Sequence, residues 1–211
     1  MVTQKRGKTA KAVKAVKPGR SKLSENLRKT LRKHEHGAKI MMELPAASYF
    51  ENSLETVKHL VSEGYSGIYI SFIRPFTNLY GLLESGGIDV KKLFFVDVAS
   101  ALVGDEQIDH ERCIHVPDNI PVDDLVRAIY VTLPKLPTKR QFIFIDSLTP
   151  LTLYKPLSET MRFSEFLVRT VQKEIDENRL VLVFNVASDL AQKKFIKDIA
   201  LRVDEVIRVG P

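Results

Sequence analysis

The segment QFIFIDSLTPL, residues 141–151, places an acid and a hydroxyl group where they could do chemistry. Asp146 ends a continuously apolar run, and Ser147 follows it directly. A carboxylate at the end of a buried parallel strand can help to hold Mg²⁺ beside nucleotide phosphates, and a neighbouring hydroxyl can assist. An aspartate can also cap the turn that follows a strand. Taken alone, the run favours the capping role over the metal role.

The segment MMELPAASYFENS, residues 41–53, joins an apolar run to a helical pattern, a junction where many α/β proteins hold phosphates. A phosphate-binding loop needs G-x-x-x-x-G-K-[ST], because glycines let the backbone N–H groups converge and the lysine reaches the outer phosphates. This segment contains no glycine and no lysine, and Pro45 has no N–H to donate. Ser48 or Ser53 could touch a ligand, but neither follows a lysine.

A third strand end carries Ile73, Arg74 and Pro75. Neither an isoleucine nor an always-protonated arginine can act as a base. Arg74 could attract an anion near the edge of a sheet, and it could equally be a surface residue at the start of the next helix.

Cys113 and His115 are two positions apart, so on a strand they share one face and could both reach a single metal. A four-ligand site would need partners that the sequence does not reveal. The interpretation that we favour is a polar loop leading into a strand, with no metal. Cys113 is the only cysteine of the chain, so it forms no internal disulfide, which fits a reducing compartment.

After Lys39, apolar runs rich in β-branched residues alternate with segments of helical period. Continuous apolar runs such as FIFID and LVLVFNV are typical of strands that are covered on both faces. We expect seven strands, at 38–43, 67–72, 93–98, 113–116, 141–146, 180–186 and 205–209, and helices at about 53–63, 78–85, 122–133, 158–178 and 189–198. This alternation predicts a three-layer α/β/α fold with a mostly parallel sheet, whose strand C-termini share the edge that binds ligands.

Basic residues are concentrated at the N-terminus. The net charge of the chain is +6, but residues 1–39 hold 13 Lys or Arg and two acids, and the remainder is mildly acidic. Residues 1–20 lack large apolar side chains and predict a disordered basic tail. Residues 21–37 predict a basic amphipathic helix, with Leu23, Leu27 and Leu31 on one face. Residues 38–211 then form the α/β domain.

The cations of the first two segments could bind nucleic acid by releasing counterions, which gives weak, salt-sensitive and sequence-independent affinity. The candidates are Lys5, Arg6, Lys8, Lys11, Lys14, Lys17, Arg20, Lys22, Arg28, Lys29, Arg32 and Lys33. A solubilising extension is an equally supported alternative, and an anionic lipid or a protein partner is a further one. Interleaved aromatic residues are missing, so base stacking is not expected.

The order of these elements resembles that of the RecA-like ATPases, and within them the KaiC-like branch. The resemblance rests on GYSGIYISFIRPFTNLYGLLESGGIDVKKLFFVDVAS (64–100) and KRQFIFIDSLTPLTLYKPLSETMRFSEFLVRTVQKEIDENRLVLVFNVAS (139–188), and it covers residues 39–211. It implies a RecA-like fold in which Asp146 and Ser147 lie beside Mg²⁺. It also implies assembly through the edges of the fold into rings or filaments.

Two departures from the family pattern concern activity. The phosphate loop has lost its glycines and lysine, and Ile73 and Arg74 stand where the family has acidic residues, including the one that orients the attacking water. These groups position or stabilise charge in the transition state. The resemblance, read with these losses, predicts a non-catalytic regulatory or scaffold subunit. The alternative is a residual ATP-binding protein or a very slow ATPase that uses Asp146, Ser147, Ser48 and Arg74.

The remaining expectations concern partners and location. We expect self-association or pairing with an active paralogue, nucleic acid as a further partner, and no cofactor, with Mg²⁺-ATP as the alternative. No run is long and apolar enough to span a bilayer, and the basic N-terminus lacks the apolar block of a secretory signal. The sequence therefore predicts a cytoplasmic protein.

Overall fold

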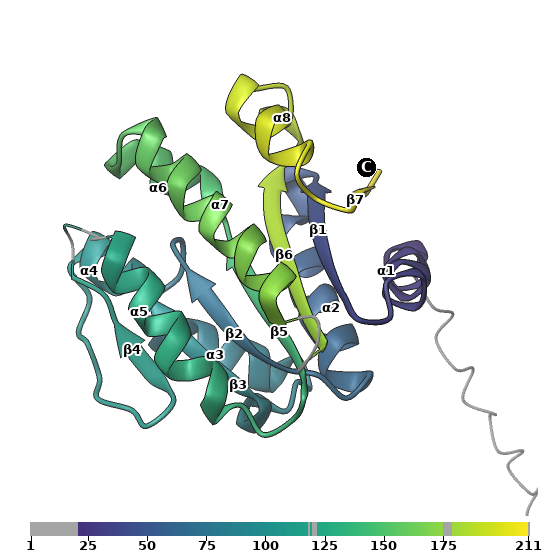
Figure 1. Ribbon diagram of the computed structural model, residues 1–211. Coiled ribbons are helices and arrows are strands. Elements are labelled where there is room, and N and C mark those ends of the chain that lie inside the picture. Colours follow the sequence, from purple (N-terminus) through teal and green to yellow (C-terminus); the bar gives the residue numbers. More distant parts are fainter. Residues whose placement is uncertain (1–20, 118, 120–121, 175–178, 211) are drawn as a thin grey trace, which may run out of the picture.

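A seven-stranded parallel sheet forms the centre of the protein in a computed structural model, which describes residues 21–117, 119, 122–174 and 179–210 (Figure 1). The strands are β1 (Gly37–Leu44), β2 (Ser66–Ser71), β3 (Leu93–Asp97), β4 (Cys113–His115), β5 (Arg140–Asp146), β6 (Arg179–Ala187) and β7 (Glu205–Arg208). Their order is β4-β3-β2-β5-β6-β1-β7, and each neighbouring pair is parallel.

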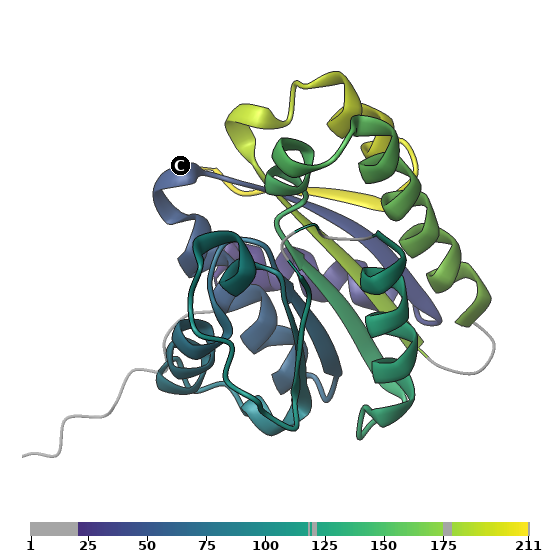
Figure 2. The same cartoon turned by 90° about the vertical axis from the view of Figure 1, so that its left-hand side faces the viewer.

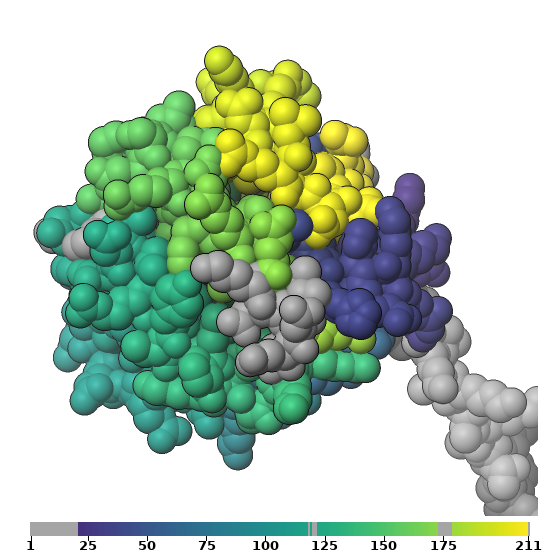
Figure 3. Space-filling view, viewed as in Figure 1, coloured from purple at the N-terminus to yellow at the C-terminus, as the bar shows by residue number. Residues whose placement is uncertain are grey.

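Helices cover both faces of the sheet (Figure 2). They are α1 (Lys22–Lys33), α2 (Tyr49–Ser62), α3 (Phe76–Ser85), α4 (Ala99–Val103), α5 (Val122–Thr132), α6 (Leu148–Tyr154), α7 (Leu157–Glu174) and α8 (Lys194–Ala200). The apolar side chains of α1, α2 and α3 share one core with one side of the sheet, and those of α5 to α8 share a second core with the other side. Figure 3 shows α5, α7 and α8 together on the face turned to the viewer. The predicted three-layer fold is confirmed.

The sequence located the strands better than the helices. All seven predicted strands are present, with ends within one residue of the prediction. The helix predicted at 53–63 begins earlier, at Tyr49, and the one predicted at 189–198 is a 3₁₀ turn (Ser188–Leu190) followed by α8. The short helices α4 and α6 were not predicted, because one or two turns carry too little periodicity to detect. No helix among the described residues is long and apolar enough to cross a membrane.

Helix α1 packs against the domain through its leucine stripe. Ser21 caps its N-terminus by accepting from Ser24 N–H at 3.1 Å, and Leu23, Leu27 and Leu31 are at most 5% exposed. The stripe is therefore covered by protein and is not free to enter a lipid surface. The helix ends at Lys33, short of the predicted residue 37.

Gly37 opens β1 instead of ending the helix. Its φ of 151° lies where side chains are rarely found, and a Cβ here would lie 2.7 Å from the carbonyl oxygen of Leu180 on β6. Only glycine fits this close approach of two backbones.

Candidate functional site

The C-terminal ends of β2, β5, β6 and β1 meet at one edge of the sheet, because these strands are parallel neighbours. Asp146 ends β5 opposite Ser71 of β2, and Ser147 follows it. The turn that carries Ser48 leaves β1 at this edge, and Arg74 lies just after β2. The four candidate residues therefore belong to the edge that binds ligands in open α/β sheets.

The carboxylate of Asp146 is buried and accepts a hydrogen bond from a tyrosine of the neighbouring strand β2. Asp146 is 2% exposed, and its Oδ2 accepts from the hydroxyl of Tyr69 at 2.5 Å. Tyr69 lies two positions before Ser71 on the same face of β2, so its ring reaches along the sheet to the end of β5. Burial raises the pKa of Asp146, and hydrogen bonding by the tyrosines together with the charge of Arg74 opposes that rise.

Tyr49 closes the site from the side of the turn after β1. Burial, and then the charge of Asp146, raise the pKa of its phenol well above the ordinary value. The phenol is close enough to lower the pKa of Asp146. No normal hydrogen bond joins the two groups, however, because among the described residues Tyr49 Oη and Asp146 Oδ1 both lack a partner. Because both oxygens are buried, the side chains around them would have to move before a hydrated Mg²⁺ could reach this carboxylate.

Asn185 of β6 adds a third polar side chain to this enclosure. Its Nδ2 donates to Ser53 Oγ at 2.9 Å, and Ser53 Oγ donates to the carbonyl of Tyr49. Ser53 is 1% exposed and connects α2 to β6. We assign Ser53 a structural role, because its hydroxyl is fully used between two elements.

The turn after β1 is a compact 3₁₀ helix, Ala46–Ser48, and does not form an open loop. The N–H of Ser48 donates to the carbonyl of Pro45, and that of Tyr49 donates to the carbonyl of Ala46. Asn52 Nδ2 donates to both oxygens of Ser48, at 2.7 Å and 2.9 Å. A phosphate loop directs its N–H groups outward to a shared anion, and here two of these N–H groups are bonded within the turn.

The side chain of Arg74 lies over the ring of Phe50, with its guanidinium carbon 4.1 Å from the ring centroid. The loop around it is fixed by Ser71, whose Oγ donates to the Arg74 carbonyl and accepts from the Arg74 N–H. Arg74 lies three positions after the end of β2, and its positive charge lowers the pKa of Asp146. Ser147 Oγ accepts from the Thr149 N–H at 3.2 Å and caps α6. The cap that the run alone favoured was Asp146, and the residue that caps the helix is instead the serine that follows it.

Tyr49, Tyr69 and Asn185 were not singled out in the sequence. Each looks like an ordinary residue of a helix start or a buried strand. A usable signal was the hydroxyl of Tyr69 between the apolar residues Ile68 and Ile70, because a buried tyrosine hydroxyl needs a partner.

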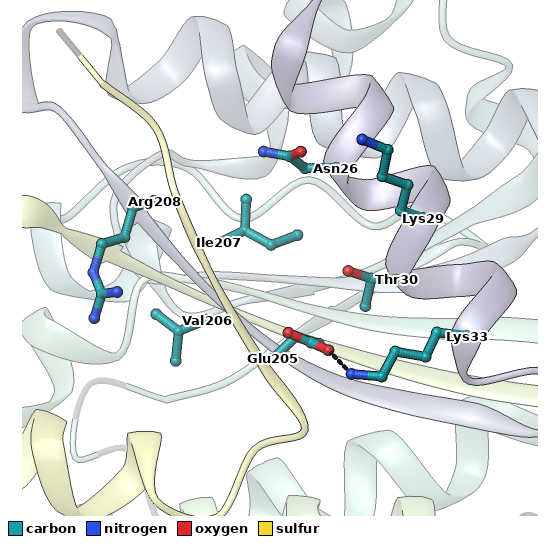
Figure 4. A pocket seen from close by; sticks show the side chains of 8 residues that line it. All are labelled: Asn26, Lys29, Thr30, Lys33, Glu205, Val206, Ile207 and Arg208. Atoms are coloured by element: carbon teal, nitrogen blue, oxygen red, sulfur yellow. Dashed lines mark hydrogen bonds and ion pairs between the residues drawn. The ribbon is translucent and has the colours of Figure 1, made fainter.

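The cations of α1 lie on its outer surface. Lys22, Lys29, Arg32 and Lys33 are exposed, and Arg28 is half-buried. Between α1 and β7 there is a pocket of about 280 Å³ (Figure 4), in which Lys33 bridges to Glu205 and Lys29 remains at the rim. The other side of α1 borders a second pocket of about 220 Å³, lined by Arg28, Leu31, Arg32, Glu35, Glu63, Tyr65, Arg140 and Arg179. The candidates Lys5 to Arg20, with the predicted tail 1–20, lie outside the described residues.

The sequence matches no protein-family model and no curated protein. Solved structures share the fold at low identity. An uncharacterized protein from Pyrococcus horikoshii, solved in complex with an unknown peptide, aligns with a TM-score of 0.63 and 14% identity over 88% of this chain and 83% of its own. A KaiC-like protein from Pyrococcus horikoshii gives 0.53 and 16%, over 81% and 70%. The flagellar accessory protein FlaH from Methanocaldococcus jannaschii gives 0.48 and 12%, over 81% and 70%.

Proposed function

We propose, from the RecA-like fold that this chain shares with a KaiC-like protein, that it is a regulatory or scaffold subunit without ATPase activity. The observation that carries this proposal is the closure of the site. Tyr69 donates to one oxygen of Asp146, the other oxygen is buried near the Tyr49 phenol, and the turn after β1 uses N–H groups internally. A site that hydrolyses ATP needs an accessible metal ligand and converging donors instead.

A calorimetric titration of the full chain with Mg²⁺-ATP, together with a phosphate-release assay, tests this proposal. We expect no saturable heat up to millimolar nucleotide and no turnover. Binding in the micromolar range that disappears in Asp146→Ala would instead establish the second candidate. Glu51→Gln is the matched control, since Glu51 is exposed on α2 near the same turn. Turnover that depends on Asp146 would end the proposal.

The second candidate, a residual nucleotide-binding protein, has one observation in its favour. Within the described part of the chain, Asp146 Oδ1, Tyr49 Oη and Asn185 Oδ1 are buried without hydrogen-bond partners. Buried polar atoms are costly when unpaired, so a ligand that paired them would bind favourably. Tyr49→Ala separates the two candidates, because opening the site should increase nucleotide affinity only if the remaining groups can hold Mg²⁺-ATP.

In this proposal the basic N-terminal arm, which comprises the segment 1–20 and the segment 21–37 that contains α1, binds nucleic acid. The support is the exposed row of cations on α1, which lies next to the basic segment 1–20. We expect the double variant Lys29→Glu/Arg32→Glu to weaken binding of a labelled duplex and to lower the salt slope by about 0.9 for each phosphate that the protein no longer neutralises. Lys193→Glu/Lys194→Glu at the start of α8 changes the charge equally and is the control. If both double variants weakened duplex binding equally, α1 would not be part of the nucleic-acid interface.

Self-association is proposed through the corner between α6 and α7. Leu153, Tyr154 and Leu157 are 78%, 52% and 50% exposed there, and adjacent exposed apolar residues are typical of protein interfaces. Leu153→Asp should therefore reduce the sedimentation coefficient of the assembly. Leu201→Asp is the control, since Leu201 is 85% exposed and follows α8, outside the corner between α6 and α7. A monomeric wild-type protein would refute this part of the proposal.

A further inference from the structure

Asp97, Cys113 and His115 lie together where β4 pairs with β3. The register places Phe95 opposite Cys113 and Asp97 opposite His115, and Cys113 and His115 face the same side of β4. One ligand atom from each of the three residues lies within 4.8 Å of the others. The sequence showed two of these residues, and the fold adds the third from the end of the neighbouring strand β3.

The orientation of the His115 ring shows which of its nitrogens faces the cluster. Its Nε2 lies 2.9 Å from the carbonyl oxygen of Ile108, and because a carbonyl only accepts, Nε2 carries a hydrogen. In the neutral ring Nδ1 then has a lone pair, and it lies 3.3 Å from Asp97 Oδ2 without forming a hydrogen bond to it. Two electron-rich atoms at this distance repel each other unless a proton or a metal cation lies between them.

Both flanking ligands have the supports that are typical of metal centres. A ligating histidine usually donates its other N–H to a carbonyl or a carboxylate, as His115 does to Ile108. Asp97 is 1% exposed, and its carboxylate accepts from the N–H of Phe76 and from the N–H and hydroxyl of Ser100. His115 Nδ1 is buried and, within the described ranges, has no hydrogen-bond partner.

Cys113 supplies the thiol that selects the metal. Burial and then the charge of Asp97 raise the pKa of this thiol to about 12, so in the free protein it is protonated and unreactive. A bound cation favours the thiolate and displaces this proton. One nitrogen, one sulfur and one oxygen ligand suit a borderline-soft ion with tetrahedral preference, which is Zn²⁺ among the common divalent cations.

We propose that Asp97, Cys113 and His115 bind one Zn²⁺ ion, with a water molecule in the fourth position. The ion would fasten β4, a three-residue strand at the edge of the sheet, to β3. This site is separate from the Asp146 enclosure, and its existence does not depend on whether the protein binds nucleotide.

Cobalt substitution tests this proposal on the full chain after removal of metals with a chelator. Tetrahedral Co²⁺ bound by a thiolate gives a sulfur-to-metal charge-transfer band, which reports the Cys113 ligand directly. We expect one equivalent of Co²⁺ to produce this band, and Zn²⁺ to abolish it by competition. Zn²⁺ should also raise the melting temperature, because binding to the folded state alone stabilises it.

Three substitutions distinguish this site from adventitious binding. Cys113→Ser should eliminate the band, and His115→Gln should weaken binding by more than the roughly 10–100-fold that loss of an outer-shell partner costs. His36→Gln removes an exposed histidine that follows α1, and it should leave the Co²⁺ titration unchanged. Wild-type protein without the band at saturating Co²⁺, or full affinity in His115→Gln, would overturn the proposal. Circular dichroism of each metal-free variant checks that it remains folded.

Discussion

Replacement of Asp146 by asparagine should stabilise the protein at neutral pH. The carboxylate is almost fully buried, and among the described side chains only Tyr69 donates to it in normal geometry. An asparagine has nearly the same shape. Its oxygen could still accept from Tyr69, and its NH₂ could donate to the unpaired oxygen of Tyr49. The substitution removes a buried charge and satisfies an unpaired atom.

The pH dependence of this stabilisation follows from the raised pKa of Asp146. The folded carboxyl binds its proton at a higher pH than the unfolded one, so the folded state holds more protons over that interval. The wild-type free energy of unfolding therefore falls as the pH rises through the interval, at about 1.4 kcal/mol for each pKa unit. The advantage of Asp146→Asn is absent below the ordinary pKa of 3.8 and complete above the folded pKa. We expect it to reach about 1–3 kcal/mol at neutral pH, which is the typical cost of a buried polar group that lacks its hydrogen-bond partner.

Urea unfolding of both proteins measures this difference. The two proteins are compared with each other at a pH just below the ordinary carboxyl pKa of 3.8 and again at about pH 8. The contributions of the other titrating groups cancel in each comparison. Asp109→Asn is the control: Asp109 is exposed, and its substitution should change stability by less than about 0.5 kcal/mol. A loss of stability in Asp146→Asn at the higher pH would refute the reasoning, since it would mean that the ionised carboxylate is favourably solvated or paired.

Three further substitutions test the packing. Leu27→Ala removes a fully buried side chain of α1 and should lower the free energy of unfolding in urea by about 2–5 kcal/mol; a decrease under about 1 kcal/mol would mean that α1 is loosely docked. Gly67→Ala would place a Cβ 2.4 Å from the Phe142 ring and should lower the melting temperature, with a cost of about 1–3 kcal/mol, unless that ring can turn away. Ser21→Ala removes the N-cap of α1 and should cost about 1 kcal/mol in the same urea assay, whereas Ser62→Ala at the end of α2 should cost less.

The strands could be predicted because fully covered parallel strands are continuous runs of apolar residues. FIFID and LVLVFNV need no knowledge of their neighbours to be identified, and their alternation with helical segments indicates the three-layer fold. The helices were located less well, since α2 begins directly after the Ala46–Ser48 turn and α6 has only seven residues. Local sequence does not contain the packing that stabilises such short elements.

Residue types along the chain are enough to show that the turn after β1 has no lysine and no glycine, and that Asp146 ends a continuously apolar strand. These facts depend only on residue type and position along the chain. Two other features depend on the fold: Tyr69 and Tyr49 lie beside Asp146, and Asp97 lies beside Cys113 and His115. The physical reason is that strand order and register choose which side chains meet, and these are set by the packing of the whole sheet between its two layers of helices.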